Sequence, residues 1–258
     1  MTTTTAGRRN KDRLGWRMKF GVLAPSTNTI VEPEMAAMRP DGVTNHNSRI
    51  YTPDAHAISN DSFMAGTRVI ADNVLDAVDS VMTCAPDQLV MGMSMVTFYG
   101  GLEGAREFQA KVEDRAGVGL AMGSTATAEA LKAIGGISRI AFVSPYFPAA
   151  NDHVRRFFQD CGFDVKRDVA LQCPSWTAIA EVTEDTLERT VVDTLDGDDV
   201  DAIVQVGTNL CMAAQVVSLE QKVGKPVVAI NTATYWNALR TNGIDDKVSG
   251  FGRLLEVH

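Results

Sequence analysis

The sequence is poor in cysteine and histidine. It contains four cysteines and four histidines, and none of them forms a CxxC, HxH or HExxH spacing. Zinc ribbons need such spacings, and the four cysteines lie far apart in the sequence, so neither a zinc ribbon nor a disulfide framework is supported. We therefore expect reduced thiols, no metal site and no cofactor. The four cysteines are Cys84, Cys161, Cys173 and Cys211.

Long apolar runs are absent as well. The longest, at 137–143 and 200–206, have the length of a strand and fall far short of the ~18 residues that span a bilayer. The amino-terminal residues are polar and lack the apolar region of a signal peptide. The sequence therefore predicts a cytoplasmic protein without a membrane partner.

Positive charge is scarce outside the amino terminus. The chain has 24 Lys and Arg against 32 Asp and Glu, a net charge of −8 at pH 7, which repels nucleic acid. Residues 1–18 are basic and lack apolar periodicity, so we expect them to form a flexible tail.

The rest of the chain has the composition of a globular protein. Hydrophobic residues make up 45% of the 258 residues, enough for one large α/β domain or two small lobes. Short β-rich runs alternate with helix-like stretches, which is typical of parallel sheets with crossover helices. The expected strands are 20–24, 88–91, 118–122, 140–144, 202–206 and 227–230. The expected helices are 62–82, 125–133, 150–160 and 183–195.

A weak internal repeat relates the two halves of the chain. The segment KFGVLAPS at 19–26 resembles RIAFVSPY at 139–146, and DQLVMGMS at 87–94 resembles DAIVQVGT at 201–208. The tripeptide TAT recurs at 125–127 and 232–234. We therefore predict two similar α/β lobes with parallel sheets, related by a pseudo-dyad, with a ligand cleft between them. The first lobe comprises 19–120 plus 241–258 and the second comprises 121–240.

Small polar residues gather where the predicted strands end. Open α/β sheets bind ligands at that edge, and the N–H groups of helix N-termini there attract anions. We therefore expect a small carboxylate or dicarboxylate as the partner, and a homo-oligomer is compatible with the sequence. The segments concerned are 25–29, 92–97, 124–127, 145–151, 207–211 and 231–234.

Several of these segments resemble a known superfamily over about residues 19–255. The segment APSTNTIVEPE at 24–34 resembles the opening strand and loop of maleate cis-trans isomerases. MGMSMVTFYGG at 91–101, the turn at Tyr146 and GFGRLL at 250–255 look more like arylmalonate decarboxylases. Both groups belong to the aspartate/glutamate racemase superfamily. The resemblance implies two facing α/β lobes and an enzyme that uses no cofactor.

The sequence departs from this superfamily at its catalytic cysteines. The resemblance implies one cysteine after a strand in each lobe, or only the second one in the decarboxylase. The matching positions here are Gly92 and Gly207. Cys211 follows Gly207 by about one helical turn, so it either projects toward the cleft or is a buried thiol.

The candidate catalytic residues are Cys211, Tyr146 and Ser94. The phenol of Tyr146 either points into the pocket or stacks in the core, and the resemblance favours the pocket. The hydroxyls and amides of the other candidates either bind a carboxylate or cap a helix. The candidate substrate-binding residues are Ser26, Asn28, Gly92, Met93, Thr97, Asn151, Gly207, Thr208 and Asn209.

These residues favour a cofactor-independent lyase that decarboxylates a malonate-type acid through an enolate-like intermediate. Met91, Met93 and Phe98 either form an apolar wall that destabilises a carboxylate or belong to the core. A maleate-type cis-trans isomerase is the first alternative, but it needs a nucleophile that Gly92 and Gly207 do not supply. A non-catalytic carboxylate-binding relative is the second.

Overall fold

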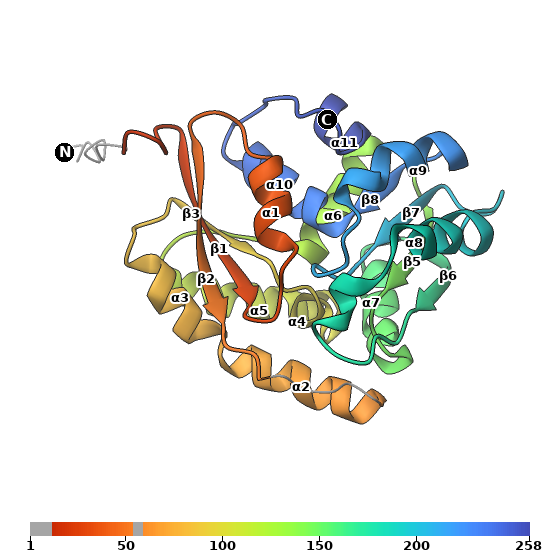
Figure 1. The fold of residues 1–258 in the computed structure, drawn as a ribbon, viewed down its shortest axis with the longest axis horizontal. Helices are drawn as coiled ribbons and strands as arrows, with labels where there is room; N and C mark the ends of the chain where they lie inside the picture. The colour runs from red at the N-terminus through yellow and green to blue at the C-terminus, as the bar shows by residue number, and fades with distance from the viewer. Residues whose placement is uncertain (1–11, 54–58) are drawn as a thin grey trace.

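The computed structural model describes residues 12–53 and 59–258, which form two four-stranded parallel sheets (Figure 1). The strand order is β2-β1-β3-β4 in the first sheet and β6-β5-β7-β8 in the second. The first sheet contains β1 (Met18–Pro25), β2 (Val43–Ile50), β3 (Gln88–Met91) and β4 (Leu120–Met122). The second contains β5 (Arg139–Ser144), β6 (Asp164–Ala170), β7 (Ala202–Gln205) and β8 (Val227–Ala229).

Helices connect successive strands, as parallel pairing requires. Those that precede β5 are α1 (Val31–Ala37), α2 (Asn60–Asp72), α3 (Val74–Met82), α4 (Met95–Phe98), α5 (Gly101–Ala116) and α6 (Gly123–Ile134). Those that follow β5 are α7 (Pro148–Asp160), η1 (Ala178–Glu181), α8 (Glu184–Arg189), η2 (Thr190–Leu195), η3 (Ala213–Gln215), α9 (Val216–Val223), α10 (Ile230–Thr241) and α11 (Arg253–Val257). No helix within the two described ranges combines the length and apolarity of a bilayer span.

The two sheets repeat one plan, which confirms the predicted fold of two similar lobes. β1 and β5, the first strands of the two repeated segments, pair with strands on both sides. The last strand of each sheet leads into a long helix, α6 after β4 and α10 after β8. These two helices pack together between the sheets (Figure 1). Gly123 permits their close approach, because a Cβ at this position would lie 2.7 Å from Cδ1 of Ile230.

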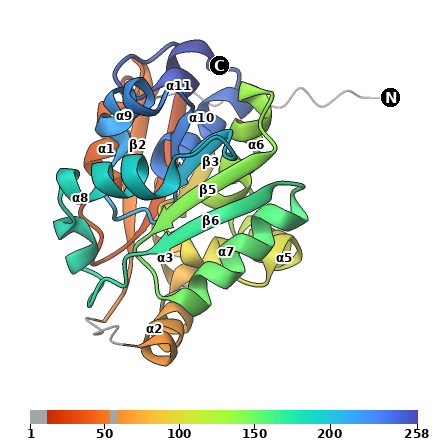
Figure 2. The same cartoon turned by 90° about the vertical axis from the view of Figure 1, so that its right-hand side faces the viewer.

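Burial follows the apolar runs of the sequence. Phe20 on β1 and Phe142 on β5 are completely buried, and both β3 and β7 are buried along their whole length. The helix α7 lies along β5 and β6 (Figure 2) and buries Phe157 and Phe158 against the core. Strands buried on both faces explain why the sequence shows continuous apolar runs rather than alternation.

Parts of the structure differ from the expectation. The helix predicted at 62–82 is interrupted at Asn73 and forms α2 and α3. The strands β2 and β6 were not among the predicted runs, because both lie at a sheet edge and carry polar side chains. Of the expected tail, residues 1–11 lie outside the described residues, whereas Arg17 bonds to Asp246 and Met18 begins β1. The lobe boundaries stay a prediction; β4 spans the proposed limit at residue 120.

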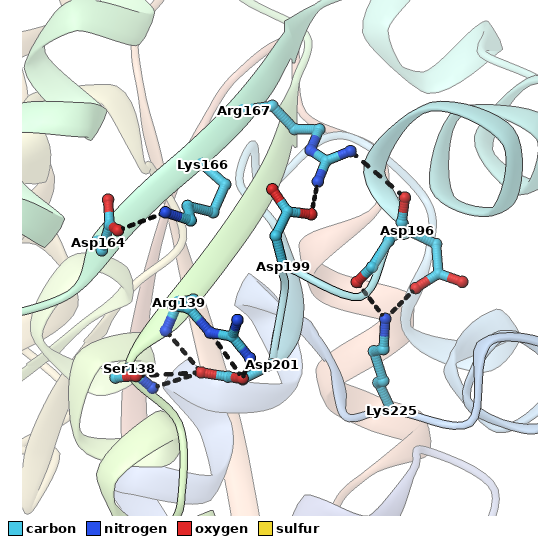
Figure 3. Close-up of polar contacts among 10 residues, drawn as sticks. Ser138, Arg139, Asp164, Lys166, Arg167, Asp196, Asp199, Asp201 and Lys225 are labelled. Atoms are coloured by element: carbon cyan, nitrogen blue, oxygen red, sulfur yellow. Dashed lines mark hydrogen bonds and ion pairs between the residues drawn. The ribbon is translucent and has the colours of Figure 1, made fainter.

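Ion pairs gather at the amino end of the second sheet (Figure 3). Arg139 pairs with Asp201, and the Asp201 carboxylate also accepts from the backbone N–H groups of Ser138 and Arg139 at 3.0 and 2.8 Å. The hydrogen bonds from the Arg139 guanidinium, and to a smaller extent those from the two backbone N–H groups, hold the pKa of Asp201 well below its usual range. Further pairs there join Lys166 to Asp164, Arg167 to Asp199 and Lys225 to Asp196. The charged side chains fix the loops at this end, opposite to the carboxyl ends of the strands.

Candidate functional site

A cavity of about 40 Å³ lies where the carboxyl ends of β1, β3, β5 and β7 converge. Its polar lining comes from the turns that directly follow these strands, and its apolar lining comes in part from α2 and η1. Ligands of open α/β sheets bind at this edge of the strands. The lining residues are Pro25, Thr27, Asn28, Ile70, Met93, Ser94, Met95, Pro145, Tyr146, Trp176, Ile179, Gly207, Thr208 and Asn209.

A chain of hydrogen bonds crosses the cavity from one half of the molecule to the other. The Tyr146 phenol oxygen lies 2.5 Å from Oγ of Ser94. Ser94 Oγ in turn accepts from the backbone N–H of Thr208 at 3.2 Å. The Thr208 hydroxyl donates to the carbonyl of Gly92 at 2.8 Å. Four hydrogen-bond donors, three hydroxyls and one backbone N–H, are thus placed together.

Two asparagines fix the loops that carry these donors. Asn28 Oδ1 accepts from the N–H groups of Ile30 and Val31, both at 2.9 Å, and so caps the start of α1. Its Nδ2 points to the Thr208 hydroxyl at 3.4 Å. Asn209 accepts from the N–H of Thr29 and donates to the carbonyl of Trp176, both at 2.9 Å. The amides therefore link the first turn to the segments after β6 and β7.

Tyr146 is the sole titratable side chain among the described lining residues. Its phenol is almost completely buried, and burial raises its pKa well above the usual value, although the bond to Ser94 acts in the opposite direction. A buried phenol with a raised pKa stays protonated at neutral pH. Tyr146 can therefore donate a hydrogen bond to an anion without carrying charge.

Apolar side chains complete the lining. Ile70 comes from α2, Met93 follows β3, and Trp176 and Ile179 come from the segment between β6 and α8. The Trp176 ring packs at 4.9 Å, between centroids, on Phe63. Sequence reasoning missed Ile70, Trp176 and Ile179, because no strand end or motif marks them.

Gly92 and Gly207 are enclosed by neighbouring atoms. At Gly92 a Cβ would lie 2.7 Å from Cγ1 of Val31 and 3.0 Å from the carbonyl of Leu23. Gly207 has a φ of +111°, and a Cβ there would overlap the Pro145 ring, with Cγ at 2.7 Å. Any larger residue at either position would require its neighbours to move.

Seven of the expected site residues line the cavity: Asn28, Met93, Ser94, Tyr146, Gly207, Thr208 and Asn209. The others do not reach it. Ser26 bonds to Thr52, Thr97 donates to the carbonyl of Ser94 at 2.7 Å, and Gly92 contributes only its carbonyl, to Thr208. Asn151 donates to Asp168 at 2.6 Å, so its amide stabilises α7 against β6.

Cys211 is exposed and lies outside the cavity lining. Although the residue as a whole is exposed, desolvation of its thiol by neighbouring protein atoms and the nearby carboxylate of Glu34 raise its pKa, so the thiol is protonated at neutral pH. Within residues 12–53 and 59–258, no three His, Cys, Asp or Glu side chains come close enough to hold a metal ion.

Proteins with related sequences include two kinds of enzyme. The chain is 29% identical to the maleate isomerase of Pseudomonas putida over 92% of its own length and 96% of that protein. It is 23% identical to the arylmalonate decarboxylase of Bordetella bronchiseptica over 90% and 97%.

Solved structures of both kinds of enzyme have the same fold as this chain. A mutant of the Nocardia farcinica maleate cis-trans isomerase with a covalently bound succinylcysteine intermediate matches with a TM-score of 0.84 over 93% of this chain and 99% of that one, at 23% identity. A liganded glycine-to-cysteine, cysteine-to-serine mutant of arylmalonate decarboxylase matches with a TM-score of 0.81 over 93% and 100%, at 20% identity. The sequence profile of the arylmalonate decarboxylase family matches residues 20–255. The chain thus belongs to the arylmalonate decarboxylase family and is an enzyme of the lyase or isomerase type.

Proposed function

We propose that the protein is a lyase that decarboxylates a malonate-type acid without a cofactor. The observation that carries the proposal is the mixed lining of the cavity. The donors of Ser94, Tyr146 and Thr208 line the same cavity as apolar side chains such as Ile70 and Ile179. Decarboxylation uses both kinds of lining, since one carboxylate must be held while the other leaves.

The donors would hold the carboxylate that remains. The bond between the α-carbon and the leaving carboxylate breaks, and its electron pair passes into the retained carboxylate, which becomes an enediolate. Carbon dioxide leaves. Neutral donors aimed at the retained oxygens stabilise this second negative charge more than they stabilise the substrate. The raised pKa of Tyr146 keeps the phenol protonated for this purpose.

The apolar lining residues would act on the leaving carboxylate. An ionised carboxylate next to Ile70 and Ile179 loses hydration, whereas neutral carbon dioxide does not need it. Water then gives one proton to the α-carbon, and the hydroxide that remains is neutralised in solution. The products are carbon dioxide and a monocarboxylate, and no electron acceptor is required.

Cis-trans isomerisation of a maleate-type acid is the second candidate. Maleate isomerases are the relatives of higher identity, which favours it. One related structure carries a succinylcysteine, a thiol adduct, whereas the described lining of this cavity contains no cysteine. The isomerase proposal would therefore need a different nucleophile, and we rank it second.

One experiment separates the candidates. The protein is incubated in deuterated water with a panel of substituted malonates and maleates, and the reaction is followed by NMR. Carbon dioxide release with deuterium at the α-carbon supports decarboxylation. A fumarate-type product without loss of carbon supports isomerisation and overturns our proposal. Thermal stabilisation by a diacid without turnover would indicate a binding protein instead.

A further inference from the structure

Glu34 of α1 is a partly buried carboxylate that lies outside the cavity and bonds to two segments of the second half of the chain. Its Oε1 accepts from the backbone N–H of Ala213 at 3.1 Å. Its Oε2 accepts from Nδ2 of Asn231, in the first turn of α10, at 2.6 Å. No base pairs with Glu34 among the described residues, so its charge is stabilised by hydrogen bonds from Asn231, from the backbone of Ala213 and Met212, and from the Cys211 thiol.

Asn231 connects Glu34 to the cavity. The same Nδ2 donates to the backbone carbonyl of Thr208 at 2.9 Å. An ionised carboxylate can only accept hydrogen bonds, so the NH₂ group of Asn231, and not its oxygen, must face Glu34. Glu34 and the Thr208 carbonyl, which are both acceptors, thus require the same amide orientation, and the charge on Glu34 strengthens this preference.

Thr208 is held at each of its polar atoms. Its N–H and hydroxyl bond to Ser94 and Gly92 of the first half, while its carbonyl bonds to Asn231. Asn28, which caps the start of α1, approaches the Thr208 hydroxyl at 3.4 Å. The helix α1 is therefore tied to Thr208 twice, at its start through Asn28 and one turn later through Glu34 and Asn231.

We propose that Glu34 is a positioning residue, whose ionised carboxylate orients Asn231 and thereby holds the Thr208 N–H in the donor cluster of the cavity. This inference rests on the proposed function, because the Thr208 N–H matters there as a donor to the enediolate. A small displacement of such a donor is enough to lower turnover. Protonated or replaced by an amide, position 34 would hold the NH₂ group of Asn231 less strongly and leave the Thr208 carbonyl to orient it.

Among the described residues that hydrogen-bond to Glu34, one is itself titratable, the Cys211 thiol. Burial raises the pKa of Glu34, and the bonds from Asn231 and Ala213 act against that rise. The Cys211 thiol also has a raised pKa, to which the charges of Glu34 and Glu184 contribute, and it is therefore neutral throughout the acid range. A titration seen at Thr208 in acid would thus report Glu34.

The test compares Glu34→Gln with Glu32→Gln. Glu32 is the matched control, since it lies on the same helix but is exposed and pairs with Arg49 at 3.1 Å. We expect Glu34→Gln to lower kcat for a malonate-type substrate by about 10- to 100-fold with KM changed less, because the substrate still fits. The control variant should keep wild-type kcat and KM.

A measurement without turnover separates this inference from the proposed function. The backbone amide signal of Thr208 in the ¹⁵N NMR spectrum of the wild-type protein is followed from pH 7 to pH 4. We expect it to titrate with Glu34 in the wild type and in Glu32→Gln, and not in Glu34→Gln. A Thr208 signal that does not change with pH in the wild type would overturn the inference. Equal kcat values for Glu34→Gln and Glu32→Gln would overturn it as well. Absence of any decarboxylation by the wild type would overturn the proposed function alone.

Discussion

The hydroxyl of Ser94 lies 2.5 Å from the phenol oxygen of Tyr146, and these two residues come from different lobes. Ser94 follows β3 of the first sheet, and Tyr146 follows β5 of the second. The contact exists because the two sheets direct the carboxyl ends of their strands to one place. A hydrogen-bonded cluster built this way depends on how the lobes are packed, and each lobe supplies only part of it.

Replacing Tyr146 by Phe removes one donor and keeps the ring. We expect kcat for a malonate-type acid to fall about 10²- to 10³-fold, the usual effect of losing one donor to a developing oxyanion. The rate of carbon dioxide release measures this. Tyr235→Phe is the control, since Tyr235 is also a buried phenol but donates to Asn45 at 3.0 Å, away from the cavity. Equal losses in the two variants would contradict the role of Tyr146.

Gly207→Ala should lower the free energy of unfolding by about 2–4 kcal/mol. The added methyl group meets Pro145, and a φ of +111° is strained for any residue other than glycine. Gly224→Ala is the matched control, because Gly224 also has a positive φ, of +69°, but no neighbour within 4 Å of the added carbon. We expect Gly224→Ala to lower the free energy of unfolding by about 1 kcal/mol. Urea unfolding measures both, and the same loss in each would show that Pro145 does not contribute.

Cys211→Ser should keep kcat within about threefold, because Cys211 is exposed and lies outside the cavity lining. The sequence makes Cys211 a candidate proton donor, so the variant is informative in either direction. Deuterium incorporation at the α-carbon, followed by NMR, is the measurement. Complete loss of incorporation in Cys211→Ser would assign the proton transfer to this thiol and remove water from the proposed mechanism.

The raised pKa of Glu34 predicts opposite effects of acid on stability and on turnover. A carboxyl whose pKa is higher in the folded than in the unfolded protein binds protons preferentially when folded. Its contribution to stability is therefore full below the unfolded pKa and is lost as the pH rises through the folded pKa.

Thermal unfolding between pH 4 and pH 7 checks this sign. Relative to Glu34→Gln, the wild type should gain stability as the pH falls, while its kcat decreases over the same interval. Stability and kcat that decrease together in acid, with the same profile in Glu34→Gln, would show that another group controls both.

The fold was predictable because its strongest signals are local. The repeated strands before Ser26 and Tyr146 carry apolar runs that periodicity detects, and the polar turns after them mark the carboxyl ends. The interruption of a helix at Asn73 was not predictable, since the apolar pattern continues on both sides of it. The strands β2 and β6 were not predicted, because edge strands with polar side chains lack the apolar signal.

The site was predictable only where it coincides with strand ends. Ser94, Tyr146 and Thr208 lie directly after strands and line the cavity as expected. Trp176 lies in a segment without strand or helix signal, and its place depends on packing against Phe63, which is 113 residues away in sequence. Whether the Asn151 amide faces the cavity or Asp168 depends on a neighbouring strand, which the local sequence does not reveal.

The hydrogen bonds between Tyr146, Ser94 and Thr208 compete with the hydrogen bonds that the same groups would donate to a ligand. A carboxylate that enters the cavity has to take over donors that already bond to one another. A neutral oxygen would exchange one ordinary hydrogen bond for another and gain little. An anionic oxygen forms charge-assisted bonds, which are about twice as strong, so the exchange favours it. The cavity can thus discriminate for negative charge although no lysine or arginine stands among its described lining residues.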